Sequence, residues 1–308
     1  MTSTSSPAFT APAVGPVRCV QALDCELGEG LLWSVREQAL YWVDILARQL
    51  HRWEPASNGL ERWTFAEEIS ALAERARAPG LIVTLRRGFA LFDPAVDAAP
   101  RYLHQPEPGR TGNRFNDGKC DAQGRFWAGS MDFACEAPTG ALYRLDPDGR
   151  CTRMDDGFAV TNGPAWAPGP QGPALYFNDT AQGCTYRYRF DPATGGASDK
   201  TLWMRWRSGD GLPDGMAADA QGRLWIAHWG GGCVTCHDPL TARELARVAL
   251  PASQVTNCAF GGPDLRTLFI TTARTGLTPA QLAAEPLAGA LFAVPVDGPG
   301  LPAALFGG

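Results

Sequence analysis

Short apolar runs alternate with turns rich in Gly, Asp and Pro along the whole chain. The clearest pair of copies reads D-A-Q-G-R-F-W-A from Asp121 and D-A-Q-G-R-L-W-I-A from Asp219. Each copy follows one apolar run and leads into a second run that carries an aromatic residue. Apolar runs of this kind on both sides of a Gly-containing turn are typical of a β-hairpin.

Four looser copies of this hairpin complete a series of six, with a period of about 45 residues. A third strand and a turn containing Asp-Pro follow most copies, so each repeat is predicted to be a three- or four-stranded antiparallel meander. Radial repetition of such sheets protects their edges. The sequence therefore predicts an all-β fold, a six-bladed β-propeller. The midpoints of the six second strands are Tyr41, Ile82, Trp127, Tyr176, Trp225 and Phe269.

The repeats run without a linker, which predicts one propeller domain over residues 17–308 rather than a β-sandwich or two domains. The last strand, over residues 290–296, is expected to close the ring beside the N-terminal region. Residues 1–16 lack the positive region and the apolar run of a signal peptide. We expect these residues to form a disordered tail.

Composition narrows the choice of partners. The formal net charge of −5 comes without a basic cluster, so neither nucleic acid nor a membrane surface is an expected partner. No segment approaches the roughly 18 apolar residues of a membrane helix. Nine cysteines form an odd set without regular spacing, which favours free thiols over a disulfide framework. We expect a cytoplasmic protein that is a monomer or a weak homo-oligomer.

Aligning the repeats brings five polar residues to one position, just before the innermost strand and close to the propeller axis. Carboxylates that face each other there repel unless a cation or a proton lies between them. Oxygen ligands of this kind suit a hard divalent cation. The alternative is that each side chain only caps its own turn, but turn chemistry alone does not repeat at a fixed offset. The five residues are Glu29, Asn116, Asn162, Asp214 and Asn257.

Eight short segments occur along the chain in the order LGEGLLW, YWVDI, NRFNDGKCD, GRFWAGSMD, TNGPAW, LPDGMAAD, GRLWIAHWGGG and CAFGGPDLRTLFITTA. Their order and spacing resemble the senescence marker protein/gluconolactonase (regucalcin) family. The resemblance spans about residues 27–292 and implies a six-bladed propeller with one divalent metal ion at its axis, whether Ca²⁺, Zn²⁺, Mn²⁺, Mg²⁺ or Fe²⁺.

The resemblance also implies roles for single residues. The metal ligands of the family fall on Glu29, Asn162 and Asp214. Its substrate-binding residues fall on Arg114 and Asn116, with Asp117 close to the substrate. Many relatives hold sugar hydroxyls with a glutamate whose position here is Ala134, with Asp132 and Glu136 as neighbours. This departure leaves the sugar preference open.

Family members of this kind hydrolyse sugar lactones, so the resemblance implies a metal-dependent lactonase that opens a glucono-, arabinono- or xylonolactone to the aldonic acid. Asp214 is expected to serve as the general base as well as a ligand. His228 follows the next strand, where it either lines the mouth or packs in the core. Two alternatives stay open: an esterase or phosphotriesterase on the same scaffold, and a calcium- or ligand-binding propeller without catalysis.

Overall fold

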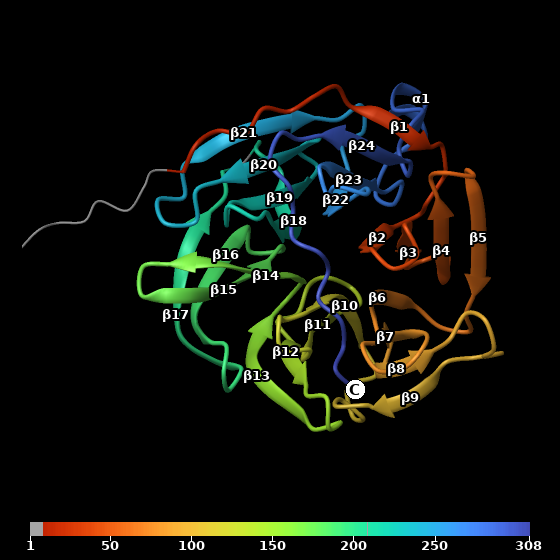
Figure 1. Cartoon of the computed structure of the whole chain (residues 1–308), viewed down its shortest axis with the longest axis vertical. Coiled ribbons are helices and arrows are strands. Elements are labelled where there is room, and N and C mark those ends of the chain that lie inside the picture. Colours follow the sequence, from red (N-terminus) through yellow and green to blue (C-terminus); the bar gives the residue numbers. More distant parts are fainter. Residues whose placement is uncertain (1–8, 208) are drawn as a thin grey trace, which may run out of the picture.

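The computed structural model describes residues 9–207 and 209–308. Its strands form six four-stranded antiparallel sheets arranged around a central axis (Figure 1). The predicted all-β fold and the six blades are therefore confirmed. In the first five blades the strands follow one another in sequence, from the innermost strand at the axis to the outermost strand at the rim.

Blades one to three account for the first half of the ring. Each begins at the axis, and its bounds follow the predicted repeat, including the degenerate second copy. Blade one contains β2 (Gly28–Ser34), β3 (Ala39–Asp44), β4 (Gln49–Glu54) and β5 (Gly59–Thr64). Blade two contains β6 (Ile69–Glu74), β7 (Leu81–Leu85), β8 (Gly88–Phe92) and β9 (Arg101–His104). Blade three contains β10 (Asn113–Cys120), β11 (Phe126–Asp132), β12 (Gly140–Leu145) and β13 (Cys151–Phe158).

Blades four to six complete the ring, and a short helix lies between the last two strands of the chain. Blade four contains β14 (Thr161–Gly169), β15 (Gly172–Asp179), β16 (Cys184–Asp191) and β17 (Gly196–Arg205). Blade five contains β18 (Leu212–Ala218), β19 (Leu224–Trp229), β20 (Cys233–His237) and β21 (Glu244–Ala249). Blade six contains β22 (Val255–Gly261), β23 (Thr267–Thr272), β24 (Leu291–Pro295) and, from the N-terminal region, β1 (Arg18–Gln21), while α1 spans Pro279–Ala284.

The N-terminal region closes the ring, as the sequence predicts. Strand β1 pairs antiparallel with β24 and supplies the outermost strand of blade six. Residues 1–8 of the predicted tail lie outside the described residues. Residues 9–16 lie against the body of the protein, where the backbone N–H of Gly15 donates to Pro295 O at 2.8 Å and Arg223 donates to Thr10 O at 3.0 Å. The first and last strands of the propeller are thus held in one sheet.

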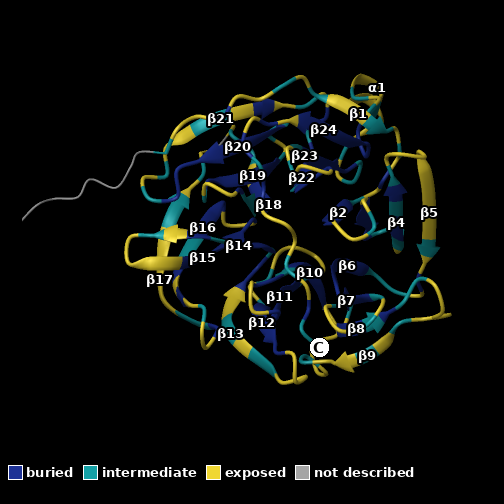
Figure 2. Cartoon of the chain, in the orientation of Figure 1, coloured by how far each residue is buried: buried dark blue, intermediate teal, exposed yellow. Residues whose placement is uncertain are grey.

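The core lies between neighbouring blades. Figure 2 shows buried inner strands and exposed rim strands such as β5. The largest buried side chains include Trp42, Trp127 and Trp225, so these tryptophans of the repeat strands belong to the core. No helix in the described part of the chain has the length and apolar character needed to cross a bilayer.

The repeated D-A-Q-G-R turn has a structural reason. Asp121 accepts hydrogen bonds from Arg125 Nε at 2.6 Å and from Trp127 Nε1 at 3.0 Å. Asp219 does the same for Arg223 and for the tryptophan of its own strand, at 2.6 and 2.9 Å. Both aspartates are buried, and a buried carboxylate needs such partners. This motif therefore fixes the hairpin rather than marking a reactive site.

The C-terminal segment crosses the axis. We call the end of the axis where the innermost strands begin the upper end, and the end where they finish the lower end. At the lower end the chain leaves blade six at Gly300, whose N–H donates to Leu265 O at 2.8 Å, and reaches blade two, where Phe306 N–H donates to Glu74 O at 2.8 Å. Figure 1 shows this segment passing over the centre of the ring. It ties blades that are not neighbours in the ring to each other.

Replacing Phe306 by Ala tests this tie. The ring of Phe306 is 2% exposed and packs in a core cluster of blades two and three, so Phe306→Ala should lower the free energy of unfolding by about 3–5 kcal/mol. The neighbouring Leu305 is 40% exposed, and Leu305→Ala should change it by less than about 0.5 kcal/mol. Urea unfolding curves measure both. Equal midpoints for the two variants would show that the segment does not tie the ring.

Candidate functional site

All six innermost strands are bulged at the upper end of the axis. A bulge turns side chains out of the regular alternation of a strand and is often found beside functional sites. Here the bulges aim polar side chains from several blades at the axis. The register shifts lie between Glu29 and Leu32, Ile69 and Ala71, Phe115 and Gly118, Asn162 and Ala165, Pro213 and Met216, and Val255 and Asn257.

The five residues that the repeat alignment placed at one position do come together, as two hydrogen-bonded pairs and one carboxylate. Asn257 Nδ2 donates to Glu29 Oε2 at 2.7 Å. Asn116 Nδ2 donates to Asn162 Oδ1 at 2.9 Å. Asp214 completes the group, and all five side chains are buried. We call these five residues the axial cluster.

Asp214 is the member of the axial cluster with the fewest partners. Its Oδ1 is buried and accepts no hydrogen bond within the described chain, whereas a buried carboxylate oxygen ordinarily has a donor. Gly215 follows it, and a Cβ on this residue would lie 2.3 Å from Asn257 Cγ. Glycine is therefore required here for Asn257 to approach the axis. The amide of Asn257 reaches Glu29 from this position.

Asp117 lies beside the axial cluster but is held differently. Its Oδ1 accepts from the N–H of Gly118 at 2.8 Å, and its Oδ2 accepts from the N–H of Gly163 at 3.1 Å. Lys119 Nζ lies 3.9 Å from Oδ2. Both carboxylate oxygens of Asp117 are thus engaged, in contrast to Oδ1 of Asp214.

Burial and mutual repulsion raise the pKa values of the carboxyl groups at the axis. Burial, with the charge of Asp117, raises the pKa of Glu29 to about 7. Burial and the charges of Glu29 and Asp117 raise the pKa of Asp214 well above its ordinary value. Burial also raises the pKa of Asp117, although Lys119 opposes this effect. The upper end of the axis therefore concentrates negative charge that favours a bound cation.

The donor set fits a hard divalent cation. Glu29 and Asp214 offer carboxylate oxygens and Asn162 offers an amide oxygen, which are the ligand types that Ca²⁺ and Mg²⁺ prefer. The unpartnered Asp214 Oδ1 is a further reason to place a cation here. Among residues 9–207 and 209–308, no three His, Cys, Asp or Glu side chains are grouped as metal ligands. An amide oxygen such as that of Asn162 would therefore have to complete a set of three protein ligands.

Arg114 approaches the axial cluster from the start of β10. Its Nη1 donates to Asn116 Oδ1 at 2.6 Å and to Phe115 O at 3.0 Å. Its remaining guanidinium nitrogens make no hydrogen bond to the described residues and are available to a ligand. Burial lowers the pKa of Arg114, while nearby acidic groups, including Glu29, oppose this effect. The buried guanidinium group of Arg114 thus lies close to the carboxylates of the axial cluster.

Two residues left open by the sequence are now placed. Ala134, at the position of the family glutamate, is exposed, and the adjacent Asp132 accepts from backbone N–H groups of its own loop at 3.1 and 2.9 Å. Asp132 therefore caps the loop and does not replace the glutamate. His228 is fully buried, with Nε2 2.6 Å from Thr235 Oγ1 and its ring 4.6 Å from that of Trp206. His228 packs in the core.

Sequence reasoning missed the residues that support the axial cluster. Asn162 Nδ2 donates to Thr180 Oγ1 at 2.8 Å, and this hydroxyl donates to Pro213 O at 2.6 Å. Asn178 Nδ2 donates to the backbone carbonyl of Asp214 at 2.6 Å. The run Asn-Asp-Thr at the end of β15, directly after its apolar residues, was the available signal. These contacts link the strand ends of blades four and five.

Comparison with known proteins gives a consistent family assignment. The sequence profile of the SMP-30/gluconolactonase/LRE-like region matches residues 27–274. The 6-deoxy-6-sulfogluconolactonase of Pseudomonas putida is 38% identical over 95% of this chain and 99% of its own. Regucalcin of Danio rerio is 33% identical over 90% of this chain and 93% of its own. The crystal structure of a calcium-binding protein, regucalcin, from Agrobacterium tumefaciens has a TM-score of 0.89 at 28% identity, covering 95% of this chain and 97% of that one.

Removing one charge from the axial cluster should stabilise the chelator-treated protein. In Asp214→Asn no charge has to be buried, so we expect the free energy of unfolding at pH 8 to rise by about 1–3 kcal/mol. The gain should grow from pH 4 to pH 8, because the unfolded aspartate ionises above about pH 4 while the folded one resists ionisation. Denaturant unfolding in EDTA measures this, with the exposed Asp148→Asn as control. A loss of stability in Asp214→Asn at pH 8 would contradict the charge argument.

Proposed function

Because the chain belongs to the SMP-30/gluconolactonase/LRE-like family, we propose that it hydrolyses a sugar lactone to the corresponding aldonic acid. The observation that carries the proposal is the buried Asp214 carboxylate, whose Oδ1 has no hydrogen-bond partner in the described chain and whose pKa the nearby Glu29 raises, with the free donors of Arg114 close by. The name of the Pseudomonas putida relative supports the same reaction. A buried and under-satisfied ionisable group is costly for folding alone and is expected at a reactive site.

Glu29, Asn162 and Asp214 would hold one divalent cation at the axis. When bound, the ion supplies a Lewis acid that polarises the lactone carbonyl and stabilises negative charge on its oxygen. The oxygen-only donor set suits Ca²⁺, Mg²⁺ or Mn²⁺. The calcium-binding relative from Agrobacterium tumefaciens makes Ca²⁺ the first ion to test.

The side chains of this protein divide the remaining work. Asp214 accepts, through one carboxylate oxygen, the proton of the water that attacks the carbonyl carbon. The bond from that carbon to the ring oxygen then breaks, and the ring oxygen takes up the proton held by Asp214 to become a hydroxyl group, which restores the Asp214 carboxylate. Arg114 and Asn116 bind and orient the lactone. Asp117, whose oxygens are both engaged by backbone N–H groups, acts as a positioning residue for the turn at Gly163.

The region around Phe133, beside Arg114, favours a lactone that carries an anionic substituent. Arg86 and Arg114 flank the ring of Phe133, with guanidinium carbons 5.0 and 5.8 Å from its centroid. The family glutamate of this region is replaced by Ala134, which removes a negative charge. Glu68, 3.7 Å from Arg86, balances only part of the positive charge. The sulfogluconolactonase of Pseudomonas putida acts on a substrate of this class by its name.

Lactone hydrolysis by the chelator-treated protein tests the proposed function. Acid release from a panel of aldonolactones should stop in EDTA and return with an added divalent ion, and Asp214→Ala should lower kcat by at least about 10³-fold. Asp148→Asn should retain the full rate. Turnover of aryl esters or phosphotriesters in place of lactones would assign the protein to a different hydrolase class. Ion binding without any turnover would favour a non-catalytic binding propeller.

Arg86→Ala tests the substrate class. Its KM for 6-deoxy-6-sulfogluconolactone should rise about tenfold, since a charge-assisted hydrogen bond is worth about 1.5–3 kcal/mol, while its KM for gluconolactone should stay within about twofold. Arg86→Lys should restore part of the difference. Steady-state kinetics on both lactones measures this. An equal change for the neutral and the sulfonated substrate would rule out charge recognition by Arg86.

A further inference from the structure

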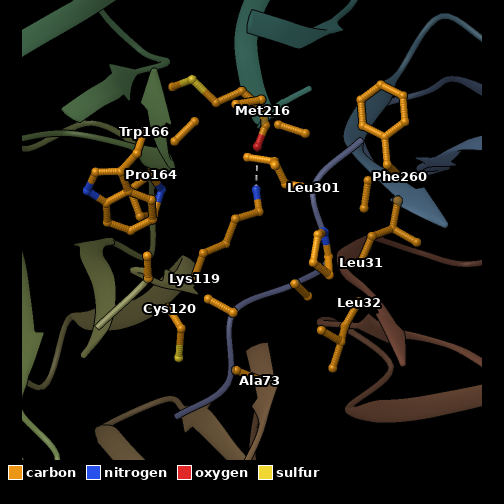
Figure 3. A pocket seen from close by; sticks show the side chains of 18 of the residues that line it. Leu31, Leu32, Ala73, Lys119, Cys120, Pro164, Trp166, Met216, Phe260 and Leu301 are labelled. Atoms are coloured by element: carbon orange, nitrogen blue, oxygen red, sulfur yellow. Dashed lines mark hydrogen bonds between the residues drawn. The ribbon is translucent and has the colours of Figure 1, made fainter. Parts of the chain in front are cut away.

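A partly open cavity of about 400 Å³ lies at the lower end of the axis. Its walls are mainly the second halves of the six innermost strands, with further residues of blades three and four such as Phe190, and its floor is the C-terminal segment (Figure 3). We call it the lower axial cavity. Pockets for small organic molecules have volumes of about 300–1,000 Å³ and mostly apolar linings. Its apolar lining includes Leu31, Leu72, Trp166, Met216, Phe260 and Leu301.

Lys119 is the only charged residue among the described residues that line the lower axial cavity. Its ammonium group donates to the backbone carbonyl of Met216, as the dashed line in Figure 3 shows. An ammonium group has three N–H donors, and no second hydrogen bond from Nζ is present within the described chain. Asp117 Oδ2 lies 3.9 Å away and forms a long ion pair with this group. Lys119 thus brings a cation with unused N–H donors to the otherwise uncharged lining of the lower axial cavity.

The floor of the lower axial cavity is hydrogen-bonded only at its ends. Gly300 and Phe306 make backbone hydrogen bonds to blades six and two. Residues 301–305 between them make no backbone hydrogen bond within the described chain, and Leu301 is 54% exposed although it also lines the cavity. Displacing these five residues breaks no backbone hydrogen bond and costs only side-chain packing such as that of Ala304 against the core cluster of blades two and three. The floor therefore provides a route of entry.

We propose that the lower axial cavity binds a small amphiphile with one unbranched hydrocarbon chain and one anionic head group, such as a medium-chain fatty acid. The carboxylate of the ligand accepts from Lys119 Nζ, and its chain packs against Leu31, Met216 and Phe260. Charge complementarity selects the anion, and the apolar lining selects the chain. This site is reached from the opposite end of the axis to Arg114. The inference is independent of the lactonase reaction.

Calorimetric titration of the full-length protein with decanoate tests the proposal, with decanol and decyltrimethylammonium as matched probes below their micellar concentrations. Decanoate should bind at one site per chain, decanol at least about tenfold more weakly, and the cationic probe without measurable heat. Lys119→Met should abolish the preference for decanoate over decanol. No saturable decanoate binding, or equal binding of all three probes, would overturn the proposal.

Filling the cavity locates the site. Ala218 and Ala304 line it from a wall and from the floor, so Ala218→Phe and Ala304→Phe should each weaken decanoate binding by at least about tenfold. Ala56, exposed in the turn between β4 and β5, provides the control, and Ala56→Phe should bind decanoate like the parent. Circular dichroism confirms folding, and either cavity variant suffices if the other does not fold. Unchanged binding in a folded cavity variant would place the ligand elsewhere and overturn the proposal.

Discussion

The main physical constraint on this structure is the repulsion between the buried carboxylates at the propeller axis. Glu29 and Asp214 face each other in a setting where burial already disfavours their charged forms, and Asp214 Oδ1 has no hydrogen-bond partner in the described chain. Like charges in a poorly solvated site ordinarily take up a proton, a cation or a paired donor. Asp117 shows the third solution, because two backbone N–H groups and the nearby Lys119 hold it. Asp214 is the carboxylate that this arrangement leaves without a donor on Oδ1, which is why the proposal places the cation beside it.

The ring holds this arrangement in place by means that are distributed over all blades. A bulge in every innermost strand aims side chains at the axis, and Gly215 leaves room for Asn257 beside Glu29. Closure by β1 and the C-terminal segment prevents the blades from separating at the two ends of the chain. The unfavourable free energy of burying the axial cluster is thus offset by the apolar cores between blades, where residues such as Trp127 and Trp225 are fully buried.

The fold and most of the axial cluster could be predicted from the sequence because the residues that form them recur once in each repeat. The apolar runs recur in each repeat, and a polar residue recurs at one offset, so alignment of the repeats was enough to bring Glu29, Asn162 and Asp214 together. The sequence could not show the register of the innermost strands at their bulges. Relative to the bulges, Glu29 and Asn162 precede the extra residues while Asp214 lies within them, and the engaged state of Asp117 depends on backbone N–H groups that carry no sequence signal. The lower axial cavity around Lys119 likewise depends on where the C-terminal segment crosses the ring.

The central claim is that the axial carboxylates form a cation site that Asp214 completes. Calorimetric titration of Ca²⁺ into chelator-treated protein tests it most directly, with Asp214→Asn titrated under the same conditions. The account predicts one Ca²⁺ bound per chain in the parent protein and a loss of at least about tenfold in affinity in the variant. Equal affinity in the two proteins, or no binding of any divalent ion by the parent, would contradict it.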